Sequence, residues 1–197
     1  MKSLFKSELP KVIIIIQARM GSKRLPGKVL LKLSNKSILE TLINQVNMTP
    51  FVHEIYVATT VNKEDDKISA LCNNLKINCF RGEVDNVLSR FISIANSSKA
   101  EIIIRLTADN PLVNSEVIKK VFSDFWIRYP FIDYVSNTGH SGYPYGLFVE
   151  IFKTDALKKL LKLNCFKDRE HVTVSFRKSK HFKSYLSKSD LNYPNIS

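Results

Sequence analysis

Four basic residues stand within one short loop, directly after a run of β-branched residues. The run is Val12–Ile16, and the loop carries Arg19, Lys23, Arg24 and Lys28. An arginine offers a forked donor to phosphate oxygens, and a lysine acts as a compact point charge. Together these side chains favour binding of a polyphosphate.

Two glycines in the same loop support an anion site. Gly21 and Gly27 allow tight turns, which bring backbone N–H groups close to an anion. The loop is not a P-loop, because five residues separate the two glycines and Val29 stands after Lys28, where that motif needs a hydroxyl. The G-x-G-x-x-G fingerprint of dinucleotide-binding proteins is absent as well. A basic loop that is merely solvated is the alternative.

A carboxylate follows a second apolar run. Asp109 stands in the segment RLTADNPL, shortly after Ile102–Ile104. A carboxylate that faces a bound polyphosphate needs a cation between the two anions, and Mg²⁺ takes one or two carboxylates together with phosphate oxygens. Asp109 is therefore a candidate magnesium ligand. The alternative is that Asp109 only forms an Asx-type turn before Pro111.

The elements that must position these loops alternate along the chain. Apolar runs at 11–16, 54–60, 78–80 and from 101 predict strands, and amphipathic segments at 37–46, 63–76, 84–95 and 115–126 predict helices. After Pro130 the pattern changes to strand-like runs at 132–137 and 143–153, a helix capped by Thr154, and a last strand at 182–187. Such alternation favours an α/β fold with a mostly parallel sheet and helices on both faces. Both polar loops should then lie at the carboxyl edge of the sheet, where ligands bind in such folds.

The composition excludes several classes of protein. A chain of 197 residues with 44% hydrophobic and 24% charged residues is typical of one globular domain. No apolar run approaches the roughly 20 residues of a membrane span, and the one near the N-terminus is too short for a signal peptide. The three cysteines form no CxxC pair, which favours reduced thiols and a cytoplasmic location. The net charge of +12 comes mainly from scattered lysines without a nucleic-acid-binding motif, so no nucleic-acid partner is expected.

Four segments together resemble a known family. They occur at 17–28 (QARMGSKRLPGK), 105–112 (RLTADNPL), 143–150 (YPYGLFVE) and 169–173 (REHVT), and 85–91 (DNVLSRF) matches a further stretch. In this order they resemble the cytidylyltransferases that make CMP-activated sugars. The similarity is closest to the spore-coat polysaccharide branch, a relative of the acylneuraminate and 3-deoxy-manno-octulosonate cytidylyltransferases. It extends over nearly the whole chain.

The resemblance implies a Rossmann-like nucleotidyltransferase that binds CTP and Mg²⁺, in which a sugar hydroxyl attacks the α-phosphorus and expels pyrophosphate. Arg19, Lys28 and Asp109 are then the catalytic residues, with Asp109 as the metal ligand. The nucleotide would be bound by these cations and by Ala18, Gly21, Ser22, Thr59, Arg81, Gly82 and Arg105. The sugar acid would be bound by Tyr143, Gly146, Glu150, Arg169 and His171, and His171 is either a general base or a structural helix residue.

The resemblance also raises expectations about the C-terminal part and the assembly. Relatives continue past 189–197 into a turn with a further aspartate that completes the metal site, so we expect residues 1–197 to be a single domain that lacks the C-terminal part of the family domain. A homologue or fragment that binds nucleotide without turnover is therefore the alternative to an active enzyme. A homodimer is expected, with 140–153 as the candidate contact.

Overall fold

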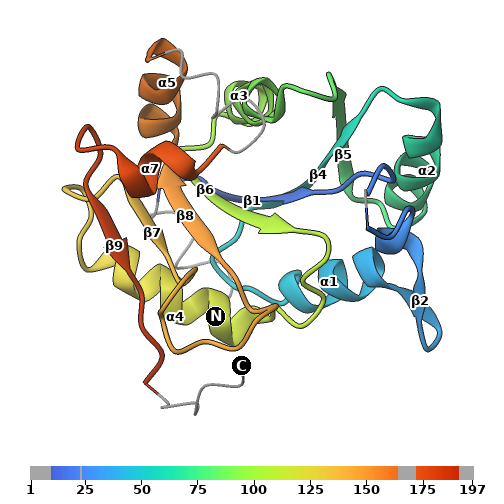
Figure 1. Cartoon of the computed structure of the whole chain (residues 1–197), viewed down its shortest axis with the longest axis horizontal. Coiled ribbons are helices and arrows are strands. Elements are labelled where there is room, and N and C mark those ends of the chain that lie inside the picture. The colour runs from blue at the N-terminus through green and yellow to red at the C-terminus, as the bar shows by residue number, and fades with distance from the viewer. Residues whose placement is uncertain (1–9, 23, 164–171, 191–197) are drawn as a thin grey trace.

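A seven-stranded sheet forms the centre of the molecule (Figure 1). The structure is a computed structural model, and it describes residues 10–22, 24–163 and 172–190. The strand order across the sheet is β5-β4-β1-β6-β8-β7-β9. The bounds are β1 Val12–Gln17, β4 Glu54–Thr60, β5 Asn78–Gly82, β6 Ile102–Thr107, β7 Tyr134–Ser136, β8 Glu150–Lys153 and β9 Ser184–Leu186. A separate hairpin pairs β2 (Lys32–Leu33) with β3 (Lys36–Ser37).

Most of the sheet is parallel, as the sequence predicts. Strand β1 pairs in parallel with both β4 and β6, and β4 pairs in parallel with β5. Only β8 runs against its two neighbours, β6 and β7, and β9 is again parallel to β7. The carboxyl ends of β5, β4, β1 and β6 therefore meet the amino end of β8 at one edge.

Helices cover both faces of the sheet, which confirms the predicted fold class (Figure 1). On one face α1 (Ile38–Val46), α2 (Asp66–Asn74) and α4 (Ser115–Trp126) bury their apolar sides in one hydrophobic cluster, which includes Ile14 and Ile16 of β1. On the other face α3 (Val87–Ser98), α5 (Thr154–Lys162) and α7 (Val174–Lys178) contribute to a second cluster, which includes Ile13 and Ile15. The five consecutive apolar residues of β1 are fully buried because both faces are covered.

Local capping signals account for several helix boundaries. The Ser37 hydroxyl accepts a hydrogen bond from the Glu40 N–H, and the Asn114 side chain accepts from the first turn of α4. The prediction that Thr154 caps α5 is wrong. Lys153 occupies the cap position, and Thr154 is the first helical residue, where its hydroxyl donates to the Ala100 carbonyl at 2.6 Å. That bond ties α5 to the segment before β6, a long-range contact that local sequence does not reveal.

Two surface features bear on the predicted location and assembly. No helix in the described ranges is long and apolar enough to cross a membrane.

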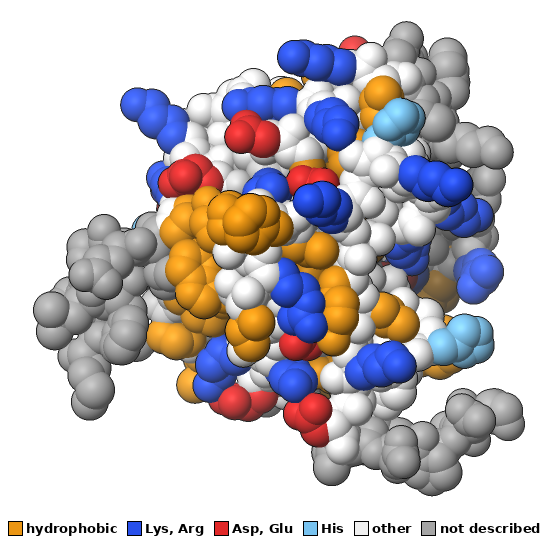
Figure 2. Space-filling model, turned by 90° about the vertical axis from the view of Figure 1, so that its left-hand side faces the viewer, with side chains coloured by type: hydrophobic (Ala, Val, Ile, Leu, Met, Phe, Trp, Pro, Cys, Tyr) orange, Lys and Arg blue, Asp and Glu red, His pale blue; other side chains and the backbone are white. Residues whose placement is uncertain are grey.

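Hydrophobic side chains gather, interspersed with basic ones, on the face of the molecule shown in Figure 2. Ile127 and Phe131 are among the exposed apolar side chains after α4, and the Arg128 guanidinium lies 3.4 Å from the centre of the Tyr185 ring.

Candidate functional site

The basic loop after β1 is held in place by a buried carboxylate. Asp65, which is 1% exposed, accepts a hydrogen bond from the Met20 N–H at 2.7 Å and from the Thr60 N–H at 3.1 Å. The Thr60 hydroxyl also donates to it. Asp65 ends the short 3₁₀ helix η2 (Lys63–Asp65) after β4, so it joins the loops that follow two neighbouring strands. Sequence reasoning missed this role because the acidic run of 64–66 is also what the start of any helix favours.

The turn that closes the loop depends on one glycine. Gly27 has φ 71°, and its N–H donates to the Met20 carbonyl at 2.8 Å. A Cβ atom at this position would lie 3.2 Å from Met20 Cε, so both conformation and space favour glycine. Gly21 also lies at the centre of a tight turn, in which the Ser22 N–H donates to the Met20 carbonyl at 2.8 Å, but its φ is not in the left-handed region. A Cβ at Gly21 would lie 3.1 Å from Glu64 Oε1.

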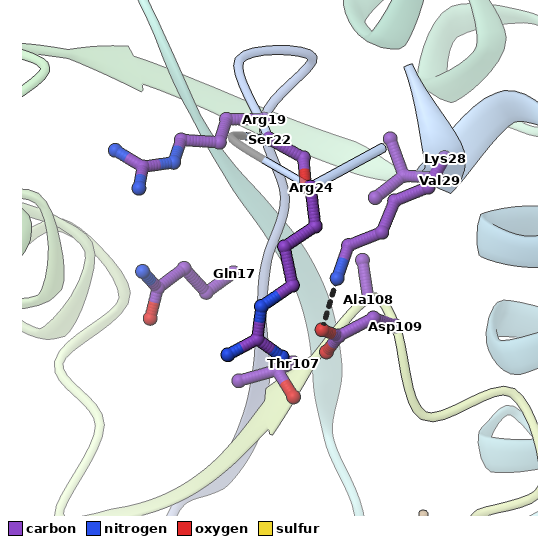
Figure 3. Close-up of a pocket in the computed structure, with 9 residues that line it drawn as sticks. All are labelled: Gln17, Arg19, Ser22, Arg24, Lys28, Val29, Thr107, Ala108 and Asp109. Carbon is purple, nitrogen blue, oxygen red and sulfur yellow. Dashed lines mark hydrogen bonds and ion pairs between the residues drawn. The ribbon is translucent and has the colours of Figure 1, made fainter. Parts of the chain in front are cut away.

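The loop and the end of β6 enclose a cavity of about 340 Å³, within the range of small-molecule sites (Figure 3). Arg24 and Lys28 extend from the loop toward the end of β6, and Arg19 points away from them (Figure 3). The cavity is lined by Gln17, Arg19, Ser22, Arg24, Lys28, Val29, Thr107, Ala108 and Asp109. Lys23 lies outside the described residues. Three cations and one carboxylate thus line the cavity, and this excess of positive charge makes it suited to an anion.

The Lys28 ammonium and the Asp109 carboxylate form an ion pair across the cavity, with 2.5 Å between Nζ and Oδ2. Burial acts to raise the pKa of Asp109, but hydrogen bonds from Lys28 and Thr107 outweigh it and hold the pKa below its usual value. Asp109 is therefore ionised near neutral pH and already carries a cation. The side chains are 30% and 44% exposed, so both stay accessible to a ligand.

A second cavity adjoins the first, and Thr107 lines both. Its lining consists of Arg105, Thr107, Asn110, Thr138, Phe148, Glu150, Thr173, Val174 and Arg177. Arg105 and Glu150 stand opposite each other in the β6–β8 register and form an ion pair. The Arg105 guanidinium also donates to Gln17 Oε1 at 2.9 Å. Arg105, which the resemblance assigns to the nucleotide, thus lies in the second cavity.

The Glu150 carboxylate is a buried anchor of this second cavity. It is 4% exposed and accepts a hydrogen bond from the Tyr134 hydroxyl at 2.5 Å. Burial would raise the pKa of Glu150, but Arg105, Tyr134 and Thr173 together lower it. Burial and the nearby Glu150 carboxylate raise the pKa of Tyr134 well above its usual value. The carboxylate is therefore charged and positions Arg105 on the cavity wall.

The residues predicted to border the base lie at the ends of β4 and β5. Thr59 is fully buried, and its hydroxyl has no hydrogen-bond partner among the described residues. The Arg81 guanidinium donates to the Thr60 and Asn62 carbonyls, each at 2.9 Å, and pairs with Asp66 at 2.7 Å. Arg81 therefore holds the β4–α2 turn. Neither Arg81 nor Gly82 lines the two cavities.

Of the residues predicted to bind the sugar, the structure places only Glu150 on a cavity wall. Tyr143 lies near α4, where burial raises its pKa and the charge of Lys120 and a hydrogen bond with Ser187 act against burial. Gly146 has φ 90°, a Cβ atom there would meet nothing within 4 Å, and it lines neither cavity. Arg169 and His171 lie outside the described residues. The cavity wall instead uses Arg177, Asn110 and Thr138, which carry no distinctive sequence signal.

The donor set for a metal is small. Within residues 10–22, 24–163 and 172–190, no group of three or more His, Cys, Asp or Glu side chains could hold a metal ion. Asp109 is the carboxylate on the wall of the first cavity. This set fits Mg²⁺, which binds through one or two carboxylates and takes further oxygens from substrate phosphates and water.

Comparison with known proteins decides the family, because the cytidylyltransferase family model matches residues 13–193. The chain belongs to the cytidylyltransferase family. A solved cytidylyltransferase from Leptospira borgpetersenii superposes with a TM-score of 0.88 at 29% identity, over 93% of this chain and 78% of that one. The predicted family is thereby confirmed, together with its nucleotidyltransferase fold.

Two curated relatives of this cytidylyltransferase are similar over most of its length. A spore coat polysaccharide biosynthesis protein of Bacillus subtilis, SpsF, is 33% identical over 172 residues, which cover 84% of this chain and 70% of that protein. An uncharacterized protein of Methanocaldococcus jannaschii is 44% identical over 164 residues. That match covers 83% of this chain and 65% of the archaeal protein, so the chain spans about two thirds of its length.

Proposed function

We propose that this cytidylyltransferase transfers CMP from CTP to a hydroxyl group of a sugar acid and releases pyrophosphate, for the synthesis of a surface polysaccharide or glycoconjugate. The observation that carries the proposal is the pair of adjoining cavities that share Thr107. One is basic and faces a carboxylate, and the other is lined by hydroxyl, amide and guanidinium groups. Such a pair can hold two reactants side by side.

The first cavity would hold the triphosphate. Arg19, Arg24 and Lys28 supply positive charge, and the turn closed by Gly27 fixes the start of the loop. Phosphoryl-type transfer depends mainly on positioning and on neutralising charge, so this chain needs no nucleophile of its own. Arg24 and Lys28 can hold phosphate oxygens next to Thr107, on the side of the second cavity. This arrangement would present the α-phosphorus to the acceptor.

Mg²⁺ would be held by Asp109 and the phosphate oxygens, and when bound it would neutralise charge that develops on the transferred group. The ammonium of Lys28 forms an ion pair with the Asp109 carboxylate. On nucleotide binding Lys28 can turn to the phosphates and leave Asp109 to the metal. The metal would then replace the Lys28 ammonium as the cation that keeps the pKa of Asp109 low.

The second cavity would hold the acceptor. Arg105 forms an ion pair with Glu150, and Arg177 is a second cation on this wall that can bind a carboxylate of the acceptor. The Arg177 guanidinium donates to the Thr138 hydroxyl at 3.1 Å. Thr138 and Asn110 can bond sugar hydroxyls. A sugar acid, such as a nonulosonic or octulosonic acid, fits this set better than a neutral sugar because its carboxylate can pair with Arg177.

The test is release of pyrophosphate from CTP and Mg²⁺ across a panel of nonulosonic and octulosonic acids and matched neutral sugars. We expect release with at least one acid and none without an acceptor. A chain that binds CTP but releases nothing would favour the second candidate, a nucleotide-binding homologue without turnover. A chain that does not bind CTP would contradict both.

Two further parts of the proposal concern assembly and compartment. We propose that two copies of the chain form a homodimer. The segment 140–153 is one candidate contact between the copies, and the face with the hydrophobic side chains in Figure 2 is another. Light scattering on the purified chain would measure its mass. The free thiols of Cys72 and Cys79 suit a reducing compartment, so we expect a cytoplasmic location.

A further inference from the structure

Arg90 is a buried cation that has no hydrogen-bond partner in the part of the chain that the structure describes. It lies in the first turn of α3 and is 1% exposed. All three of its guanidinium nitrogens, Nε, Nη1 and Nη2, are buried, and none has a hydrogen-bond partner among the described residues. Buried arginines are ordinarily paired or hydrogen-bonded, since an uncompensated buried charge costs several kcal/mol. The Arg105–Glu150 pair of the same protein shows the ordinary arrangement.

The surrounding structure makes room for this side chain. A Cβ atom at Gly82 would lie 2.6 Å from Arg90 Cγ and 3.2 Å from Cδ, so the stem of the arginine occupies the space that any side chain at 82 would need. Gly82 ends β5, at the same edge of the sheet as the basic loop. The missing side chain at 82 therefore allows Arg90 to lie along this edge.

Two charged groups of the basic loop region act on Arg90. Burial lowers the pKa of Arg90, the charge of Arg19 acts in the same direction, and Asp65 opposes both. Asp65 does not pair with Arg90, because its two oxygens accept hydrogen bonds from Met20 and Thr60. Arg19 lines the first cavity. A guanidinium group on the wall of the first cavity thus acts on the buried Arg90 and disfavours its charge.

We propose that Arg90 is a nucleotide-binding residue, and that together with Arg19 it binds one phosphate group of the nucleotide. A phosphate oxygen between the two guanidinium groups would supply the missing acceptor and neutralise the repulsion. A neutral group such as a base carbonyl would accept a hydrogen bond but would leave the charge of Arg90 uncompensated. The inference rests on the proposed nucleotide site, and it adds a cation from α3 to those of the basic loop.

The test compares Arg90→Met, which keeps the stem but removes the charge, with wild type. Calorimetric titrations with inorganic pyrophosphate, CTP and cytidine separate the phosphates from the base and ribose. We expect about ten- to a hundredfold weaker binding of pyrophosphate and of CTP, and unchanged binding of cytidine. Arg128→Met is the matched control, since it removes the same charge over the Tyr185 ring, away from the site. It should leave all three affinities within about twofold of wild type.

The thermal stability of the ligand-free protein distinguishes ligand binding from a structural role. Removal of an uncompensated buried charge should leave the melting temperature of Arg90→Met equal to or above that of wild type. A structural arginine would instead give a lower melting temperature with unchanged affinity, and that result would overturn the proposal. Weaker binding of cytidine with unchanged pyrophosphate would also overturn it, because Arg90 would then contact the base.

Gly82→Ala provides a second variant if Arg90→Met does not fold. The added methyl group displaces the Arg90 stem but keeps its charge in the protein, so pyrophosphate binding should weaken by a similar factor. Unchanged pyrophosphate binding in this variant would contradict the proposal. A wild type that binds pyrophosphate in an Arg90-dependent way, but has no preference for CTP and releases no product, would refute the proposed function and leave the Arg90 inference standing.

Discussion

The Asp109→Asn variant tests the metal assignment most directly, because it keeps the shape of the side chain and removes only its charge. The pair it breaks joins two side chains that are 30% and 44% exposed. Solvent screens such a pair, and pairs of this kind contribute about 0.2–1 kcal/mol to stability. The unfolding free energy of Asp109→Asn should therefore fall by about 1 kcal/mol or less, which urea denaturation at neutral pH would measure.

The Asp109→Asn substitution should change the magnesium dependence of CTP binding much more than it changes stability. In wild type we expect CTP to bind about tenfold or more tightly with Mg²⁺ than without, because the metal joins Asp109 to the triphosphate. In Asp109→Asn the two affinities should agree within about threefold. Without Mg²⁺ the variant should bind CTP as well as wild type or up to about fivefold more tightly, since Lys28 no longer has to leave a carboxylate.

The assay is calorimetric titration of both proteins with CTP, with Mg²⁺ and with a chelator, beside a measurement of pyrophosphate release. Release should fall to background in the variant, because the transferred phosphate loses the cation that neutralises it. A wild type whose CTP affinity ignores Mg²⁺, or a variant that stays fully dependent on it, would refute the reasoning. Asp109 would then serve only to hold Lys28 and the turn.

The remaining predictions concern the nucleotide and the buried charges. Arg19→Ala and Lys28→Ala should each weaken CTP binding about ten- to a hundredfold without unfolding the protein, and unchanged titrations in both would contradict a phosphate role. CTP should raise the melting temperature more than ATP, GTP or UTP at equal concentration, and equal shifts would indicate a generic polyphosphate site. Glu150→Gln should lower the unfolding free energy by about 3–5 kcal/mol, because it leaves the Arg105 charge uncompensated, whereas Tyr134→Phe should cost only about 1 kcal/mol in the same denaturation experiment. The folded pKa of Asp109 lies below its ordinary value of 3.8, so its contribution to stability should be present above pH 3.8 and lost as the pH falls through the folded pKa. When the unfolding free energy is measured against pH, Asp109→Asn should lack this acid-dependent loss of stability.

The sequence by itself determined the elements and the place of the main loop. Hydrophobic period and length distinguish strands from helices, and an apolar run such as Val12–Ile16 predicts a strand covered on both faces. Because ligands bind at the carboxyl edge of such sheets, the loop with Lys28 and the turn with Asp109 could be predicted to meet there, and they do. These inferences succeed because they depend on neighbours in sequence and on one general rule of topology.

Only the tertiary structure decided which charges meet. The register of the β6–β8 pair places Arg105 opposite Glu150 in the second cavity, and the turn after β4 brings Asp65 under the basic loop. The lack of a side chain at Gly82 lets Arg90 lie unpaired at the same edge. The sequence pattern around a charged residue does not reveal whether that residue is solvated, paired or without a partner in the folded protein. Its role depends on the burial and the partners that the packing of distant segments provides.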